Sequence, residues 1–95
     1  MTHIFEVTDK SGRRIRLPKE RWKHIQVEHS RISDLEELKK ALINPLKITQ
    51  SKYDPENVCY YYSYNKNFKR YLFVAVKYLN GDGFIITSYH MRKIQ

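Results

Sequence analysis

The sequence predicts an α+β domain: an N-terminal β-hairpin, then two α-helices, then a four-stranded antiparallel β-meander. Three observations lead to this prediction. β-rich segments occur near the N-terminus and again after residue 46, segments of helical periodicity lie between them, and the connections between the later strands are short. A chain of 95 residues has room for one core, so residues 1–95 are expected to form a single domain.

The hairpin is predicted from two alternating segments, residues 4–8 and 13–17, which flank a turn at residues 9–12. Alternation of apolar and polar side chains is typical of strands with one buried face. Arg14 and Arg16 then lie on the outer face of the hairpin, which is therefore expected to be basic.

A first helix is expected over residues 19–28. Pro18 precedes it and suits the first turn of a helix, where its missing N–H is not needed. Trp22 and Ile25 are three residues apart and form a short apolar stripe.

The second helix has clearer boundaries. Ser33 is the expected N-cap, with Glu36 three residues later as its capping-box partner, and Asn44-Pro45 ends the helix. The apolar stripe of this helix consists of Leu35, Leu38, Ala41 and Leu42.

The later strands are expected over residues 46–51, 58–65, 71–78 and 84–90. The first is predicted to be an edge strand. The third is the most hydrophobic and is therefore the expected centre of the sheet. Asn80-Gly81-Asp82-Gly83 is a strong hairpin signal between the last two strands.

Charge and composition restrict the function more than the fold. The net charge is +8 and the isoelectric point is about 9.7, which favours a polyanionic partner such as RNA, DNA, an acidic protein or an anionic membrane surface. A basic surface that serves only solubility is the plainer alternative. The single cysteine, Cys59, excludes an internal disulfide and a cysteine-based zinc site.

The expected location is the cytoplasm. The longest apolar run, Tyr71–Val76, is far shorter than the roughly 20 residues that span a bilayer, so no membrane association through a helix is expected. The N-terminus lacks the basic and apolar regions of a secretory signal.

Three stretches of the chain resemble a known family. They are Leu17–Ile25 followed by His29, then Leu42–Ile48, and then Val74–Tyr89. In this order they resemble small phage- and toxin-system proteins of the barnase–EndoU–colicin–RelE (BECR) nuclease group. The chain departs from the pattern at Ser30, where relatives commonly have proline, and at Ser88, where they commonly have alanine. The resemblance implies a metal-independent endoribonuclease without a cofactor, often a toxin neutralised by a small antitoxin protein.

Such a ribonuclease needs a general base for the 2′-hydroxyl, a general acid for the 5′-oxygen and a cation for the developing phosphorane charge. His24 and His29 suit the first two roles, because histidine titrates near neutral pH. On a continuous helix they are about 140° apart, so their assignment follows from the resemblance. Lys77, at the end of the expected central strand, suits the third role. The plainer alternative for His24 and His29 is that they are solvated surface histidines, and for Lys77 that it is an ordinary lysine at a strand end.

The last strand offers two alternative sets of partners for Lys77. Strict alternation, with a two-residue turn, places Lys77 on the same face as Ser88 and His90. A shift of one residue reverses this grouping and brings Thr87 and Tyr89 to Lys77 instead. The resemblance favours Thr87 as a phosphate-binding hydroxyl, with Tyr89 beside it, and leaves His90 as a reserve general acid.

RNA binding is expected to involve basic and aromatic side chains. Alternation places Tyr60, Tyr62 and Tyr64 on one face of their strand and Tyr61 on the other. Most of these tyrosines are expected to be structural, and one or two on an open face are candidates to stack an RNA base. The candidate phosphate-contacting residues are Arg13, Arg14, Arg16, Arg21, Lys69, Arg70, Arg92 and Lys93.

The leading functional hypothesis is therefore a metal-independent endoribonuclease, the toxin of a toxin–antitoxin pair, that cleaves RNA through attack by the 2′-hydroxyl. Two alternatives use the same basic surface without catalysis. One is a nucleic-acid-binding module, and the other is a domain that docks an acidic protein.

Overall fold

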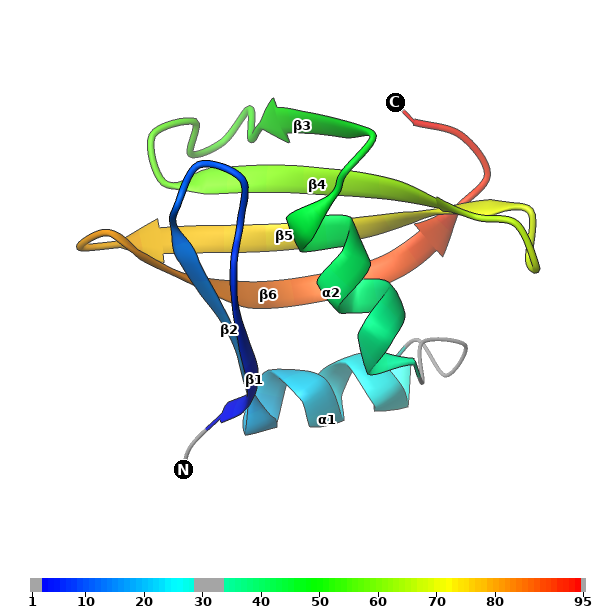
Figure 1. The fold of residues 1–95 in the computed structure, drawn as a ribbon, viewed down its shortest axis with the longest axis horizontal. Coiled ribbons are helices and arrows are strands. Elements are labelled where there is room, and N and C mark those ends of the chain that lie inside the picture. Colours follow the sequence, from blue (N-terminus) through cyan, green and yellow to red (C-terminus); the bar gives the residue numbers. More distant parts are fainter. Residues whose placement is uncertain (1–2, 29–33, 95) are drawn as a thin grey trace.

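The computed structural model describes residues 3–28 and 34–94 (Figure 1). The elements are β1 (His3–Thr8), β2 (Arg14–Pro18), α1 (Lys19–Glu28), α2 (Leu35–Ile43), β3 (Lys47–Gln50), β4 (Val58–Asn65), β5 (Arg70–Leu79) and β6 (Asp82–Met91). The predicted α+β class, with two helices between an N-terminal hairpin and later strands, is confirmed.

The strands form one six-stranded mixed sheet in the order β1-β2-β6-β5-β4-β3. The expected four-stranded antiparallel meander is therefore only part of the sheet, which also includes the N-terminal hairpin. The difference is a parallel pairing of β2 with β6, in which Arg16 lies opposite Phe84. The reason is burial: Ile15 and Leu17 of the hairpin are fully buried in the same core as Ile85 of β6. The hairpin reaches that core only by joining the sheet.

Both helices contribute to this main core. Ile25 of α1 and Leu38 and Leu42 of α2 are fully buried against apolar residues of the central strands, among them Val74 and Val76. In Figure 1, α2 crosses the sheet and α1 lies beside β6. The opposite face, here called the open face, has a smaller apolar cluster centred on residues 62, 73 and 75, to which neither helix contributes a described residue.

The start of α2 differs from the prediction. Its N-cap is Asp34, whose Oδ1 accepts a hydrogen bond from the backbone N–H of Glu36 at 2.9 Å, and Ser33 lies outside the described residues. Aspartate caps as effectively as serine, so the expected boundary moves by one residue. The predicted end is confirmed, because Asn44 is the C-cap and its backbone N–H donates to the carbonyl of Lys40.

The β5–β6 hairpin turns at Asn80 and Gly81, whose φ angles are +53° and +85°. Two consecutive positive φ values are what a type I′ turn requires, and Asn-Gly is its preferred sequence. The hairpin predicted at this position is therefore confirmed, with Leu79 opposite Asp82.

The β1–β2 turn is tied to the sheet by buried polar side chains. Asp9 accepts hydrogen bonds from Ser11, from the backbone of Arg13 and from the hydroxyl of Tyr61 on β4. The Tyr61 hydroxyl is also hydrogen-bonded to that of Tyr78 on β5, and the Arg13 guanidinium lies 4.0 Å from the Tyr78 ring centroid. This network, here called the Asp9 network, joins three parts of the chain on the helix-covered face.

We expect Gly83→Ala to lower the free energy of unfolding by about 1–3 kcal/mol, the usual cost of overpacking a core. A Cβ at Gly83 would lie 2.6 Å from Cε1 of Tyr78 and 3.1 Å from Cγ1 of Val76. Urea denaturation measures the loss. In the double variant with Tyr78→Leu the losses should be less than additive, because the smaller side chain leaves space for the methyl group; simple additivity would contradict this explanation.

Candidate functional site

A β-bulge in β6 decides which side chains share the open face with Lys77. Ala75 lies opposite Thr87, but the next residue, Val76, lies opposite Ile85, so Ile86 has no partner in the pairing register. An extra residue reverses the alternation beyond it. Thr87 and Tyr89 therefore lie on the open face with Lys77, as the resemblance implied.

The alternative set, Lys77 with Ser88 and His90, is wrong. Ser88 is fully buried on the helix-covered face, where its hydroxyl donates to the carbonyl of Phe73 at 2.7 Å. Nε2 of His90 lies 3.1 Å from Oε2 of Glu37 on α2, and the His90 side chain is 5% exposed. The bulge is the physical reason, because without it both residues would point to the face of Lys77.

Cross-strand pairing arranges the open face in rows. Lys77 is flanked by Val58 on β4 and Phe84 on β6. The next row places Ala75 between Tyr60 and Thr87, and the row after it places Phe73 between Tyr62 and Tyr89. Rows are about 7 Å apart, since each residue of a strand advances by roughly 3.4 Å. The cation and the hydroxyl of the predicted site therefore lie next to a group of aromatic rings.

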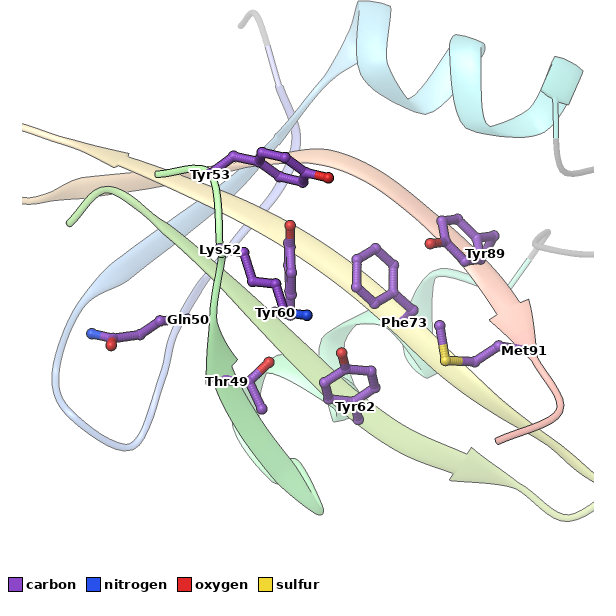
Figure 2. Close-up of a pocket in the computed structure, with 9 residues that line it drawn as sticks. All are labelled: Thr49, Gln50, Lys52, Tyr53, Tyr60, Tyr62, Phe73, Tyr89 and Met91. Atoms are coloured by element: carbon purple, nitrogen blue, oxygen red, sulfur yellow. The ribbon is translucent and has the colours of Figure 1, made fainter. Parts of the chain in front are cut away.

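These rings form the floor of a cavity of about 370 Å³ (Figure 2). The floor consists of Tyr60, Tyr62, Phe73, Tyr89 and Met91. Thr49, Gln50, Lys52 and Tyr53, from β3 and the loop after it, also line the cavity. Sequence reasoning singled out several of the tyrosines but missed Lys52 and Tyr53, because their position depends on the path of a loop.

Phe73 is the centre of the aromatic floor. Its ring centroid lies 4.7 Å from that of Tyr89 in a stacked arrangement, and 4.9 Å and 5.6 Å from those of Tyr60 and Tyr62 in tilted ones. Burial, together with the nearby Tyr62 and Tyr60 hydroxyls, raises the pKa of Tyr89 above its ordinary value. At neutral pH Tyr89 therefore keeps its proton and is suited to donate a hydrogen bond, not to act as a base.

The loop at the edge of the cavity is held by Ser51, which is buried. Its Oγ lies 3.1 Å from the Tyr60 hydroxyl, which donates to it, and it also accepts hydrogen bonds from the backbone N–H groups of Tyr53 and Asp54. These bonds fix the loop against β4. The backbone of Tyr53 is thereby held in place although the residue is 95% exposed.

A second bulge brings an unpredicted histidine to the open face. Phe5 lies opposite Leu17 and His3 opposite Pro18, so Ile4 has no partner in the register. His3 lines a cavity of about 190 Å³ with Arg16, Pro18 and Phe84. Simple alternation would place His3 on the buried face of Phe5, so the sequence contains no signal for its position. Phe84 borders this cavity and lies opposite Lys77.

One of the two histidines that the resemblance assigned, His24, is exposed on α1. His29 lies outside the described residues.

The predicted phosphate-contacting residues differ in their surroundings. The hairpin arginines have carboxylate partners: Arg13 with Asp9, Arg14 with Asp82, and Arg16 with both Asp82 and Glu6, at 3.2–3.9 Å. Lys69 and Arg70 lie at the β4–β5 turn. The exposed members of the set are Arg14, Arg21, Lys69, Arg92 and Lys93.

Comparisons of the chain with protein-family models, with curated proteins and with solved structures find no match. Within residues 3–28 and 34–94, no three His, Cys, Asp or Glu side chains are grouped closely enough to hold a metal ion. Among the described helices, none has the length and apolar character needed to cross a membrane.

Proposed function

We propose that this protein is a metal-independent endoribonuclease of the BECR type whose active site is the open face around Lys77 and Thr87. The observation that carries the proposal is the bulge at Ile86, which groups a cation, a hydroxyl and aromatic rings on one face. The cation and the hydroxyl are groups that can stabilise the phosphorane in cleavage without a metal, and the rings can stack a base of the substrate. The net charge of +8 supports a polyanionic substrate.

In the proposed reaction a histidine removes the proton of the 2′-hydroxyl, and the 2′-oxygen attacks phosphorus. The bond from phosphorus to the 5′-oxygen breaks, and a general acid protonates the leaving oxygen, which yields a 2′,3′-cyclic phosphate. Lys77 stabilises the charge on the phosphorane, and Thr87 donates a hydrogen bond to a phosphate oxygen. We assign the base to His3, because it lines a cavity with the Phe84 neighbour of Lys77, and leave the acid to His24 or His29.

This assignment is tested by incubating the purified protein with mixed RNA in excess EDTA. The wild type should produce cyclic phosphate ends. His3→Ala should cleave about 10²–10⁴ times more slowly, the usual contribution of a general acid or base. If His3→Ala keeps the wild-type rate while His24→Ala/His29→Ala loses it, the base is one of the latter. Lys10→Ala, in the exposed β1–β2 turn, is the control for a surface substitution on the same hairpin.

As a toxin, the protein would act in the cytoplasm and be neutralised by a small antitoxin. Expression of the wild type should arrest growth, whereas expression of an inactive variant should not.

The cavity favours one other function, a non-catalytic RNA-binding module, because stacking on its rings needs no catalysis. Salt-sensitive RNA binding without cleavage would support that module. Absence of both would favour a domain that docks an acidic protein.

A further inference from the structure

The aromatic cavity of the open face has the composition of a nucleobase site. Four floor residues have aromatic rings, and the ring of Phe73 contacts the other three, those of Tyr60, Tyr62 and Tyr89. Base–aromatic stacking tolerates every base, because each base has a π-face. A volume of about 370 Å³ lies within the range of roughly 300–1,000 Å³ that is usual for small-molecule sites.

Tyr53 supplies a ring at the mouth of this cavity. Its side chain is almost fully exposed, yet its backbone N–H is bonded to the buried Ser51 at 3.1 Å. Figure 2 shows the Tyr53 ring at the edge of the cavity, next to Tyr60. A large exposed ring on an anchored loop contributes little to the core, but it is well placed to cover a planar group that lies on the floor.

The positive charge in and near the cavity favours a ligand that carries a phosphate. Among the described residues that line the cavity, Lys52 is basic and none is acidic, and Lys77 lies two rows from Phe73 on the same strand and face. A nucleotide has a planar base for the rings and a phosphate for the lysines. An apolar peptide segment would use the rings alone and leave both cations without a partner.

The position of the cavity relates it to the proposed chemistry. Along the open face of β5, Phe73 is followed by the small Ala75 and then by Lys77. Two rows correspond to about 14 Å along the strand, and the flanking Tyr60 and Thr87 lie between. Thr87 and Lys77 are therefore within reach of the backbone of a single strand that has one base stacked on the floor.

We propose that this cavity binds an unpaired nucleobase of single-stranded RNA, on the same face of the sheet as the phosphate that is cleaved. The inference rests on the proposed function, because it takes RNA to be the ligand. It adds a substrate class, since the bases of a duplex are stacked on each other and cannot enter the cavity. Thr49, which lies opposite Tyr60 in the register, supplies a polar group at its edge for the base.

The test measures binding separately from cleavage. The probes are a fluorescein-labelled 2′-O-methyl hexanucleotide, which has no free 2′-hydroxyl to attack, and an abasic oligomer of the same length and charge. Wild type should bind the first more tightly. Tyr53→Ala should weaken that binding about fivefold or more, the lower end of the effect of removing one base–aromatic stack, and leave binding of the abasic oligomer unchanged.

Tyr64→Ala is the matched control. Tyr64 is on the same face of β4, is 42% exposed and contacts Tyr71 outside the cavity, so its loss should change neither affinity. Equal binding of both probes by the wild type, or an unchanged affinity in Tyr53→Ala, would overturn the nucleobase site even if RNA is cleaved. Base-dependent binding without cleavage of unmodified RNA would support the nucleobase site and overturn the ribonuclease.

Discussion

Replacing Lys77 with methionine is expected to slow RNA cleavage by about 10²–10³, the range found when one group that stabilises a transition-state charge is removed. Lys77 is half-buried between Val58 and Phe84, so the methionine side chain retains most of the apolar contact of the lysine stem. Only the cation is lost. Single-turnover cleavage in EDTA, with saturating protein, measures the chemical step without the effect of weaker binding.

Lys10→Met is the matched control for this substitution. It removes the same charge from the exposed β1–β2 turn, and it should affect binding slightly and the single-turnover rate not at all. Thr87→Val, which replaces the hydroxyl by a methyl group, should also slow the reaction, by a smaller factor. A wild-type rate in Lys77→Met would show that another group stabilises the phosphorane, and would remove Lys77 from the mechanism.

Asp9→Ala is expected to lower the free energy of unfolding by about 3 kcal/mol, because hydrogen bonds to a charged group are worth roughly 1.5–3 kcal/mol each and buried partners are left unsatisfied. Oδ2 of Asp9 accepts from Tyr61 at 2.8 Å, and Oδ1 accepts from Ser11 and Arg13 at 2.7–3.0 Å. Urea denaturation measures the loss. Asp34→Ala, at the exposed N-cap of α2, is the comparison and should cost about 1 kcal/mol.

The Asp9 network also predicts how stability depends on pH. Burial alone raises the pKa of Asp9, but the hydrogen bonds from Ser11, Tyr61 and the Arg13 backbone, with the Arg13 charge, lower it below its ordinary value. A carboxylate with a lowered pKa in the folded state stabilises the protein above its unfolded pKa, about 3.9. That stability is lost as the pH falls through the lower, folded value.

Urea denaturation between about pH 5 and pH 2 tests this dependence, since it spans the ordinary pKa of an aspartate and the region below it. The wild type should lose stability progressively as the pH falls. Asp9→Asn should show a shallower loss over the same interval, because the neutral amide does not titrate. An acid transition of equal steepness in both proteins would show that other carboxylates account for it.

Most secondary structure follows from local patterns in the sequence. Residues 19–28 and 58–65 have the expected helix and strand boundaries, and Asn80-Gly81 forms the expected turn. These features depend on side-chain periodicity and on backbone preferences of neighbouring residues, which a single sequence contains. The same patterns gave Lys77 and the tyrosines of β4 as candidates for the site, whereas Thr87 came from the resemblance.

The arrangement of those candidates depends on tertiary structure. The bulges at Ile4 and Ile86 have no local signature, yet they bring His3, Thr87 and Tyr89 to the open face and leave His90 with Glu37. A bulge forms where the two strands pack best against the rest of the core, so it depends on residues far away in the chain. Periodicity therefore determined the strands, whereas packing between distant strands determined their faces, the parallel joining of the hairpin and the composition of the site.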